Sequence, residues 1–270
     1  MNRYQFNKAE HVHTLDDKPL IGTSGVSSVI SKPLSYWASG LAVKTLGIPD
    51  PKVLTKLKHK KHTQKEYDEL VLSASQVQQE IREMSVEKYI KLLDCAYRAH
   101  ATTLVEKAEE GTDLHSELER YVKDQIEGIT EPIKKYHPRI QPFIDWSKEN
   151  VETFMWSEVH CYSEKHWLGG ISDCGIIDKQ GRRAIVDFKS SKQAYLPQFW
   201  QCAGYDIEIS ENGGFTSTGD KLFELVNPID YYVVVPFGAE KPVPELNFDT
   251  AGCKEAFLAE LLLYKKLPRD

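Results

Sequence analysis

The chain has 270 residues, 41% of them hydrophobic, and a formal net charge of −6. A chain of this length can bury a sizeable core, as one large domain or as two small ones. It contains no run of eighteen apolar residues, which excludes a membrane-spanning helix of the usual length. Residues 1–13 show neither the apolar stretch of a signal peptide nor the Arg and Ser bias of a transit peptide. We therefore expect an intracellular protein with no membrane partner.

The five cysteines are scattered along the chain and form no CxxC pair. This argues against a zinc ribbon and against a disulfide framework. We expect these cysteines to be reduced and mostly buried in the core. They are Cys95, Cys161, Cys174, Cys202 and Cys253.

The first half of the chain has the pattern of helices. Residues 21–47 contain turn signals and then a short helical run that ends at Gly47. Thr63 and Glu66 have the spacing of a capping box, which predicts a helix from there to about Arg82.

Ser85 can cap the next helix, which we expect to run towards Glu110 and to be interrupted at Gly111. Thr112 or Asp113 then caps a further helix with one apolar face. The residues expected on that face are Leu114, Leu118, Tyr121, Val122 and Ile126.

After Trp156 the pattern changes to short β-rich runs that alternate with helical segments. The sequence thus predicts an α/β or α+β fold, with a mixed central β-sheet flanked by helices. We expect residues 1–110 to form a helical N-terminal portion packed on a core of residues 111–270. The expected strands are residues 155–162, 171–177, 183–189 and 230–236, and the expected helices of this half are residues 196–209 and 250–266.

The most informative segment is the predicted hairpin, which carries two carboxylates and an amine. A three-residue loop with Gly181 in the left-handed conformation pairs residues whose numbers sum to 360. Asp173 then lies opposite Asp187, and directly opposed side chains have Cβ atoms about 5 Å apart. Alternation along the strand puts Lys189 on the same face as Asp187, while Phe188 points the other way.

Two other interpretations of this segment remain open. A one-residue slip, with a two-residue turn at Gln180 and Gly181, would place Phe188 opposite Asp173 and dissolve the cluster. The charges could also be solvated surface residues, because short motifs match by chance. If the charges do converge, the geometry suits metal-assisted cleavage of a phosphodiester.

The most basic stretch lies between Pro51 and Lys65, where six lysines and two histidines occur without an acid. Local potential rather than total charge steers a polyanion, so the negative net charge does not exclude a nucleic-acid partner. The stretch is either a solvated loop or a segment that contacts DNA phosphates beside the active site. The lysines assigned to that contact are Lys56, Lys58, Lys60 and Lys61.

Further polar residues could join the hairpin. His115 and Glu119 are four residues apart, and so are Gln201 and Tyr205, so each pair shares one edge of its expected helix. Glu158 lies on the strand before the hairpin. Taken singly, each of these is more often a surface pair or the edge of an amphipathic helix than part of a site.

Several motifs occur in the order GTDLHSELERY, WSEVH, GGISD, IVDFK and QFWQCAGY. Together they resemble the RecB-type nuclease branch of the PD-(D/E)xK superfamily, over about residues 98–206. A segment nearer the N-terminus, TSGVSSVISKPLSYWASG, is more loosely similar to phage and mitochondrial exonucleases of that branch. The resemblance implies a restriction-endonuclease-like core.

The resemblance also implies roles for the matching residues. His115, Asp173 and Asp187 match metal ligands, and the backbone carbonyl of Phe188 is a further one. Lys189 completes the D-x-K pair with Asp187. The remaining matches are Gln201 and Tyr205, associated with DNA contact and support of the catalytic site, and Glu158, an acid frequent on the preceding strand.

These residue types suit the chemistry for physical reasons. Mg²⁺ prefers oxygen ligands and keeps several waters, so two carboxylates, a carbonyl and one His leave room for water and a phosphate oxygen. A His ligand makes Mn²⁺ a good substitute. Lys189 can orient or deprotonate the attacking water and stabilise the developing negative charge.

The resemblance implies a metal-dependent exonuclease acting on DNA with free ends, in phage-type recombination, replication or repair. Its expected partner is a strand-annealing or single-strand-binding protein, in the cytoplasm of a bacterium or a phage-infected host. We expect no iron–sulfur cluster, because only Cys253 lies in the last sixty residues. We expect no bound nucleotide, because the motif GxxxxGK[ST] is absent.

Three alternatives remain. A structure- or site-directed endonuclease is the alternative within the same superfamily. A non-catalytic DNA-binding module of a recombination complex is the second, although none of the expected site residues has been lost. The third is a zinc metallohydrolase with His115 and Glu119 as ligands, which lacks the further His or Cys spacing usual at zinc sites.

Overall fold

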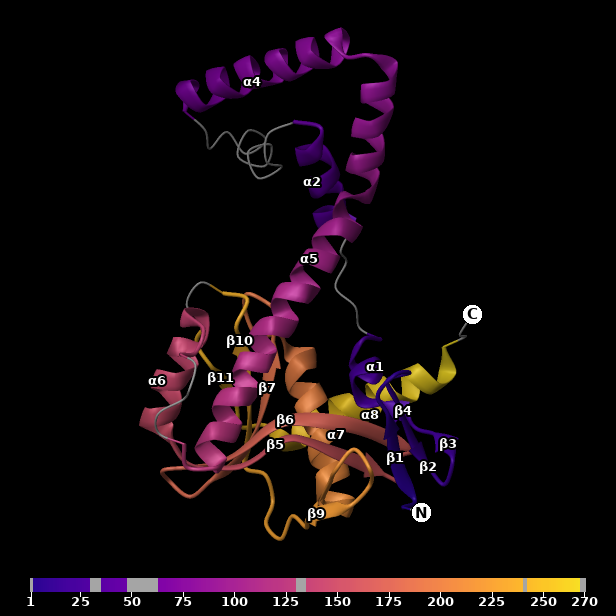
Figure 1. Cartoon of the computed structure of the whole chain (residues 1–270), viewed down its shortest axis with the longest axis vertical. Helices are drawn as coiled ribbons and strands as arrows, with labels where there is room; N and C mark the ends of the chain where they lie inside the picture. Colours follow the sequence, from indigo (N-terminus) through magenta and orange to yellow (C-terminus); the bar gives the residue numbers. More distant parts are fainter. Residues whose placement is uncertain (1, 30–34, 48–62, 130–134, 240–241, 268–270) are drawn as a thin grey trace. The chain divides into compact units, whose positions relative to one another are not determined.

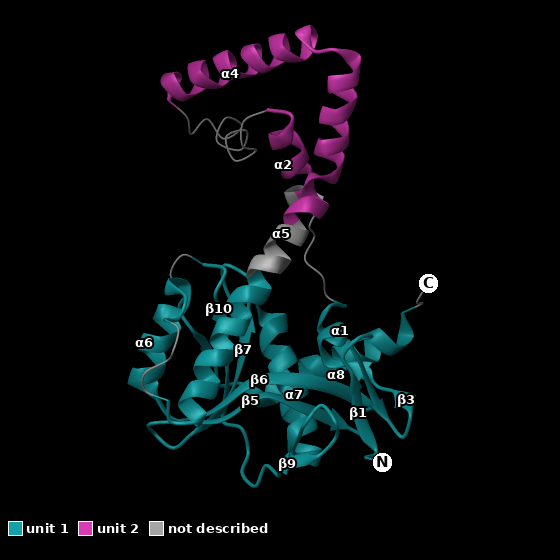
Figure 2. Ribbon diagram, in the orientation of Figure 1, with its two compact units in different colours: residues 1–31, 110–270 teal, residues 32–109 magenta. Residues whose placement is uncertain are grey.

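A computed structural model describes residues 2–29, 35–47, 63–129, 135–239 and 242–267. The chain forms two compact units, shown in different colours in Figure 2. We call residues 32–109 the helical unit, and residues 1–31 with 110–270 the core unit. The core unit resumes close to the expected boundary, but residues 1–31, which we expected in the helical portion, belong to it instead.

The helical unit comprises α2 (Ser35–Thr45), α4 (Gln64–Glu83) and the first part of α5 (Val86–Ile126) (Figure 1). The predicted capping box begins α4. The Glu66 backbone N–H donates to the Thr63 hydroxyl at 3.3 Å, and the Thr63 N–H donates to the Glu66 carboxylate at 2.8 Å. The capping-box prediction is therefore confirmed.

Two further predicted helix ends occur in the structure. Beyond the last residue of α2, Gly47 has a φ of +77°, a left-handed conformation that suits glycine after a helix. At the start of α5, the Lys88 N–H donates to the Ser85 hydroxyl at 3.4 Å.

The helix α5 is continuous over 41 residues, so the expected break at Gly111, with a new cap at Thr112 or Asp113, is wrong. Glycine costs a helix only about 1 kcal/mol relative to alanine, which packing can offset. A Cβ at position 111 would lie 3.1 Å from the Cβ of Ser190, so the glycine lets the helix approach the end of a strand closely.

The apolar face expected after that break is present, with one exception. Ile126, the last residue of α5, is 45% exposed, because the helix ends there and leaves the packed layer. The buried residues are Leu114, Leu118, Tyr121 and Val122.

Eight strands form the mixed sheet of the core unit, in the order β11-β10-β7-β6-β5-β8-β9, with β4 paired to β6. The pairs β7–β10 and β4–β6 are parallel, and the other pairs are antiparallel. The strands are β4 (Ile21–Gly22), β5 (Val151–Ser163), β6 (Leu168–Asp178), β7 (Arg183–Lys189), β8 (Gly214–Phe215), β9 (Lys221–Phe223), β10 (Tyr231–Pro236) and β11 (Glu245–Asn247).

Helices cover both faces of this sheet, which confirms the predicted mixed sheet flanked by helices (Figure 1). Val186 of β7 points into the core under the C-terminal part of α5 and α6, and its neighbour Ile185 points into the core under α7 and α8. The remaining helices of the unit are α1 (Thr23–Ser27), the 3-10 turn η1 (Pro138–Ile140), α6 (Gln141–Asn150), α7 (Leu196–Asn212) and α8 (Thr250–Lys266).

A small antiparallel sheet of β1 (Tyr4–Asn7), β2 (Val12–Leu15) and β3 (Lys18–Pro19) precedes these elements. We call it the N-terminal sheet. It was not anticipated from the sequence, which we expected to be helical in this half. Tyr4 and Leu15 of the N-terminal sheet are buried in a separate small core of aromatic and aliphatic side chains.

The cysteines are free, and all except Cys95 are buried, as expected. Within the described parts of the chain, no helix is both long and apolar enough to span a membrane.

Candidate metal and catalytic site

The β6–β7 hairpin has the predicted register. Cys174 pairs with Val186, and Ile177 pairs with Arg183, so paired numbers sum to 360. The connecting loop carries Gly181 with a φ of +80°, the left-handed conformation that the three-residue loop requires. The alternative register, displaced by one residue, is therefore excluded.

The pairing of β6 with β7 ends at Cys174, and the residues just beyond it form the site. The Asp173 carboxylate accepts a hydrogen bond from the Phe188 backbone N–H at 2.7 Å. The Lys189 ammonium lies 2.8 and 2.7 Å from the two carboxylate oxygens of Asp187, which is only 1% exposed. Two carboxylates and one amine thus gather at the open end of the hairpin.

His115 reaches this cluster from α5. Its Nε2 lies 3.3 Å from Oδ2 of Asp173, and its Nδ1 lies 3.8 Å from Oε1 of Glu158. The edge of its ring meets the ring of Phe188, with centroids 5.8 Å apart. The imidazole therefore stands between the aspartate of β6 and the glutamate of β5.

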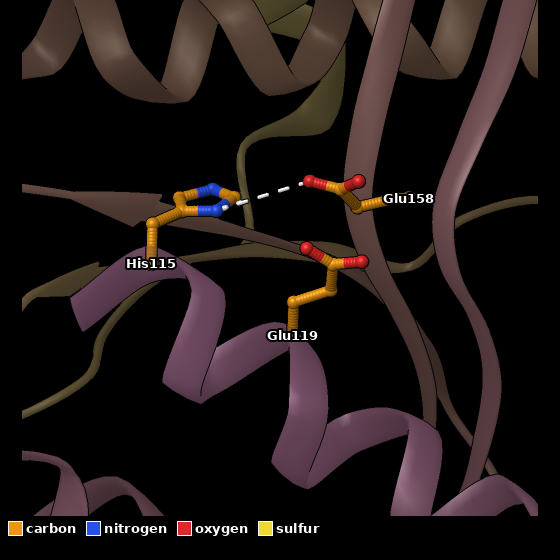
Figure 3. Close-up of side chains that lie close together, drawn as sticks. All are labelled: His115, Glu119 and Glu158. Carbon is orange, nitrogen blue, oxygen red and sulfur yellow. Dashed lines mark ion pairs between the residues drawn. The ribbon is translucent and has the colours of Figure 1, made fainter. Parts of the chain in front are cut away.

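A second acidic group adjoins the first. His115, Glu119 and Glu158 each offer a ligand atom, and these atoms lie within 4.8 Å of one another (Figure 3). Glu119 also pairs with Lys123. The sequence offered Glu119 as a polar residue that could join the hairpin and as a zinc ligand, on the signal of its position one helical turn after His115.

Glu158 takes an unusual backbone conformation to reach the site. Its φ is +48°, and the pairs that flank it on β5 and β6 place it in register with Asp173. A left-handed conformation costs a residue other than glycine about 1–2 kcal/mol. Such strain is commonly concentrated at functional sites, which favours a role for this glutamate.

The environment gives the two aspartates different acidities. Burial raises the pKa of Asp187 to about 6, although Lys189 acts in the opposite direction. Burial also acts to raise the pKa of Asp173, but the bond to His115 and the charge of Lys189 outweigh it and the pKa is lowered. Both are carboxylates at neutral pH.

The two cationic groups respond to these carboxylates. Burial acts to lower the pKa of Lys189, but Asp187 and Asp173 outweigh it, so the pKa is raised and the amine is an ammonium. Burial likewise opposes the charged form of His115, yet its contact with Asp173 raises its pKa. Burial, followed by the charge of Glu119, raises the pKa of Glu158.

The helix α7 supports the site from the other side of the hairpin. Gln201 donates a hydrogen bond of 2.6 Å to the hydroxyl of Tyr205, and both side chains are buried. Burial, followed by the charges of Asp187 and Asp173, raises the pKa of Tyr205, which keeps its hydroxyl protonated. Gln201 thus holds Tyr205, and Tyr205 is the member of this pair that lines the open space beside the site.

Two adjacent glycines of β6 let other elements approach it. A Cβ at Gly170 would lie 2.7 Å from the ring of Tyr205, and a Cβ at Gly169 would lie 2.7 Å from the Cβ of His13. Gly170 therefore leaves room for Tyr205 of α7, and Gly169 leaves room for His13 of the N-terminal sheet.

A groove of about 660 Å³ connects the acidic residues with the N-terminal sheet. Glu119, Glu158, Asp173 and Tyr205 line it on the side of the site. Its other side was missed by sequence reasoning, because the N-terminal sheet was not expected. The side chains there include Phe6, Lys8, His11, His13 and His160.

The basic stretch expected to contact DNA lies outside the described residues at all four assigned positions: Lys56, Lys58, Lys60 and Lys61. A scan against models of protein families gave no match to this chain, and a search of curated proteins gave none either.

Proposed function

We propose that this protein is a metal-dependent deoxyribonuclease that degrades DNA from free ends. The observation that carries the proposal is the convergence of Asp173, Asp187 and Lys189 at the open end of the hairpin, with His115 3.3 Å from Asp173. A surface charge cluster would not be expected to bury Asp187 almost completely or to hold an ammonium against it.

The donor set fits a hard divalent cation. Asp173, Asp187 and the Phe188 carbonyl, with His115, would hold Mg²⁺ or Mn²⁺, and Glu158 stands close enough to His115 to join them. When bound, such a cation would acidify a water and offset charge on the phosphate. This set of oxygen donors with one imidazole has no thiolate, which disfavours a softer metal.

The side chains of the protein supply the remaining chemistry. Lys189 is an ammonium in this environment, so we assign it to stabilising the negative charge that develops on the phosphate oxygens, not to removing a proton. Tyr205 keeps its hydroxyl proton and can donate a hydrogen bond into the groove. Gln201 positions that hydroxyl.

The preference for ends, and a role in phage-type recombination, replication or repair, rest on the resemblance to RecB-type nucleases. The same resemblance makes a strand-annealing or single-strand-binding protein the proposed partner. No iron–sulfur cluster and no nucleotide enter this proposal.

The test is incubation of the purified protein with linear and with covalently closed circular DNA, in Mg²⁺, in Mn²⁺ or in EDTA. We expect degradation of linear DNA only, and none in EDTA. Nicking of the circles would identify an endonuclease instead. Binding of DNA without cleavage in either metal would favour a non-catalytic module.

One observation favours a second candidate, a zinc metallohydrolase, because His115, Glu119 and Glu158 lie close enough together to share one ion. The two candidates differ in their need for Lys189, which is not part of that group. A hydrolase activity supported by Zn²⁺, lost in Glu119→Gln and retained in Lys189→Ala, would establish the second candidate.

A further inference from the structure

The groove beside the acidic residues has an aromatic wall. The centroid of the Phe6 ring on β1 lies 4.6 Å from that of His13 and 4.9 Å from that of His160. The rings of Phe6 and His11 meet edge to face, with centroids 5.3 Å apart. All four rings line the groove. We call these four residues the aromatic wall.

The aromatic wall is held in place from behind. The hydroxyl of Tyr4 lies 2.6 Å from Nδ1 of His13 and 3.4 Å from Nδ1 of His160, and Tyr4 itself is buried. Such partners fix the orientation of both rings before any ligand arrives. A preformed wall loses little conformational entropy on binding.

His13 and His160 form the buried side of the aromatic wall, because they are only 8% and 9% exposed. Burial lowers the pKa of His13 to about 3. At neutral pH the His13 ring is therefore neutral and does not act as a phosphate-binding cation.

We propose that the aromatic wall binds an unpaired nucleotide of the DNA strand next to the scissile phosphodiester, with its base stacked on Phe6. This inference rests on the proposed nuclease function. The aromatic wall and three acidic residues of the site, Glu119, Glu158 and Asp173, line one groove, so a single strand can contact both. Lys8, which lines the same groove, would contact a phosphate of that strand.

The proposal concerns an unpaired base for a physical reason. Inside a duplex both faces of each base are covered by its neighbours, and at a blunt end only the outer face of the last pair is open, so an aromatic side chain can stack on any other base only after that base has left the helix. Every base has such a face, so the contact would not select a sequence. We therefore expect this site to bind a strand end that is single-stranded over at least one nucleotide.

The test uses the Lys189→Ala protein, which should bind DNA without degrading it, in Mg²⁺. The probes are fluorescent single-stranded thymidine oligonucleotides, either intact or carrying one abasic residue at successive positions from the end. Base stacking is worth about 1–3 kcal/mol, so adding Phe6→Ala should weaken binding of the intact probe by about 5–150-fold. One abasic position should weaken binding to the protein that keeps Phe6, and should have little further effect in Phe6→Ala.

Matched variants separate stacking from folding. Phe6→Leu keeps apolar bulk against the histidines and should lose binding like Phe6→Ala, whereas Phe6→Trp should restore it. Phe248, an exposed aromatic residue that does not line the groove, provides the control Phe248→Ala, which should bind like its parent. Thermal melting of each variant identifies any loss of folding.

The outcomes distinguish this inference from the proposed function. If the protein degrades linear DNA, but Phe6→Leu and the abasic probes bind normally, the aromatic wall does not hold a base and only the inference fails. If the folded protein neither binds nor degrades DNA, both fail. A blunt duplex that binds as tightly as a frayed or single-stranded end would also overturn the inference.

Discussion

Two hairpins of the core unit contribute to one groove, and they are built differently. The β6–β7 hairpin has strands of 11 and 7 residues in the middle of a sheet covered on both faces, and it carries charged groups at its open end. The β1–β2 hairpin has strands of only 4 residues in a separate small sheet, and it carries aromatic rings.

The difference follows from what each kind of group needs. A buried charge is tolerated only beside an opposite charge held at a fixed distance, which a central, fully covered hairpin provides for Asp187 and Lys189. A stacking surface tolerates small displacements and needs only rings with an open face, which a short peripheral sheet can supply. The predictions below test this division between a catalytic hairpin and a binding hairpin.

The largest effect is expected from Lys189→Ala. Removing the ammonium should reduce DNA cleavage by roughly 10²–10⁴-fold, because the phosphate then loses one of the two groups assigned to offset its charge, while DNA binding stays nearly unchanged. Lys192→Ala removes an exposed lysine just beyond β7 and is the matched control. Unchanged cleavage by Lys189→Ala would remove the assigned role.

The basic stretch provides a test of whether the two hairpins suffice for DNA binding. Neutralising Lys56, Lys58, Lys60 and Lys61 together should weaken binding and flatten its dependence on salt, by up to about 3 in the slope of log affinity against log salt concentration. The slope is measured by titration from about 50 to about 200 mM salt, a range in which phosphate contacts change the affinity strongly. An unchanged slope would indicate that the stretch is a solvated loop.

Metal binding should depend on pH through the catalytic hairpin. The pKa of Asp187 is raised to about 6, and only its carboxylate form binds a cation. Protonation of Asp187 alone should lower Mn²⁺ affinity by about tenfold for each pH unit below 6, and protonation of His115, whose pKa is raised, should start the loss at higher pH and make it steeper. Calorimetric titration with Mn²⁺ at several values between about pH 5 and pH 8, the range in which histidine usually titrates, measures the affinity. An affinity independent of pH would contradict it.

The smallest effects concern the two glycines that admit neighbouring elements to β6. Gly169→Ala should press on His13, and Gly170→Ala should press on Tyr205, each lowering stability by about 1–3 kcal/mol. Gly170→Ala should also reduce cleavage, whereas Gly169→Ala should mainly weaken binding of single strands. Denaturant unfolding measures the stability of both variants, and assays of cleavage and of single-strand binding measure their functional effects. Equal effects of the two variants in both assays would contradict the different roles of the two hairpins.

The β6–β7 hairpin could be predicted from the sequence because its determinants are local. The three-residue loop with Gly181 in the left-handed conformation fixes its register. The cap of α4 and the bounds of α8 were predictable for the same reason.

Other features depend on contacts between distant segments. Gly111 does not end α5, because the helix passes close to Ser190, which no local pattern reveals. Glu158 lies close to Glu119, and Glu158 itself has a left-handed conformation within β5. The strands of the N-terminal sheet are too short for a clear alternation, so its aromatic wall could not be assigned to the groove in advance.

The most direct test of the central claim is the position of Mn²⁺ in crystals of the protein, located by its anomalous scattering. We expect a peak between the carboxylates of Asp173 and Asp187, beside the Phe188 carbonyl and within reach of His115. A peak held only by His115, Glu119 and Glu158, away from Asp187 of β7, would contradict the claim that the β6–β7 hairpin is the catalytic centre.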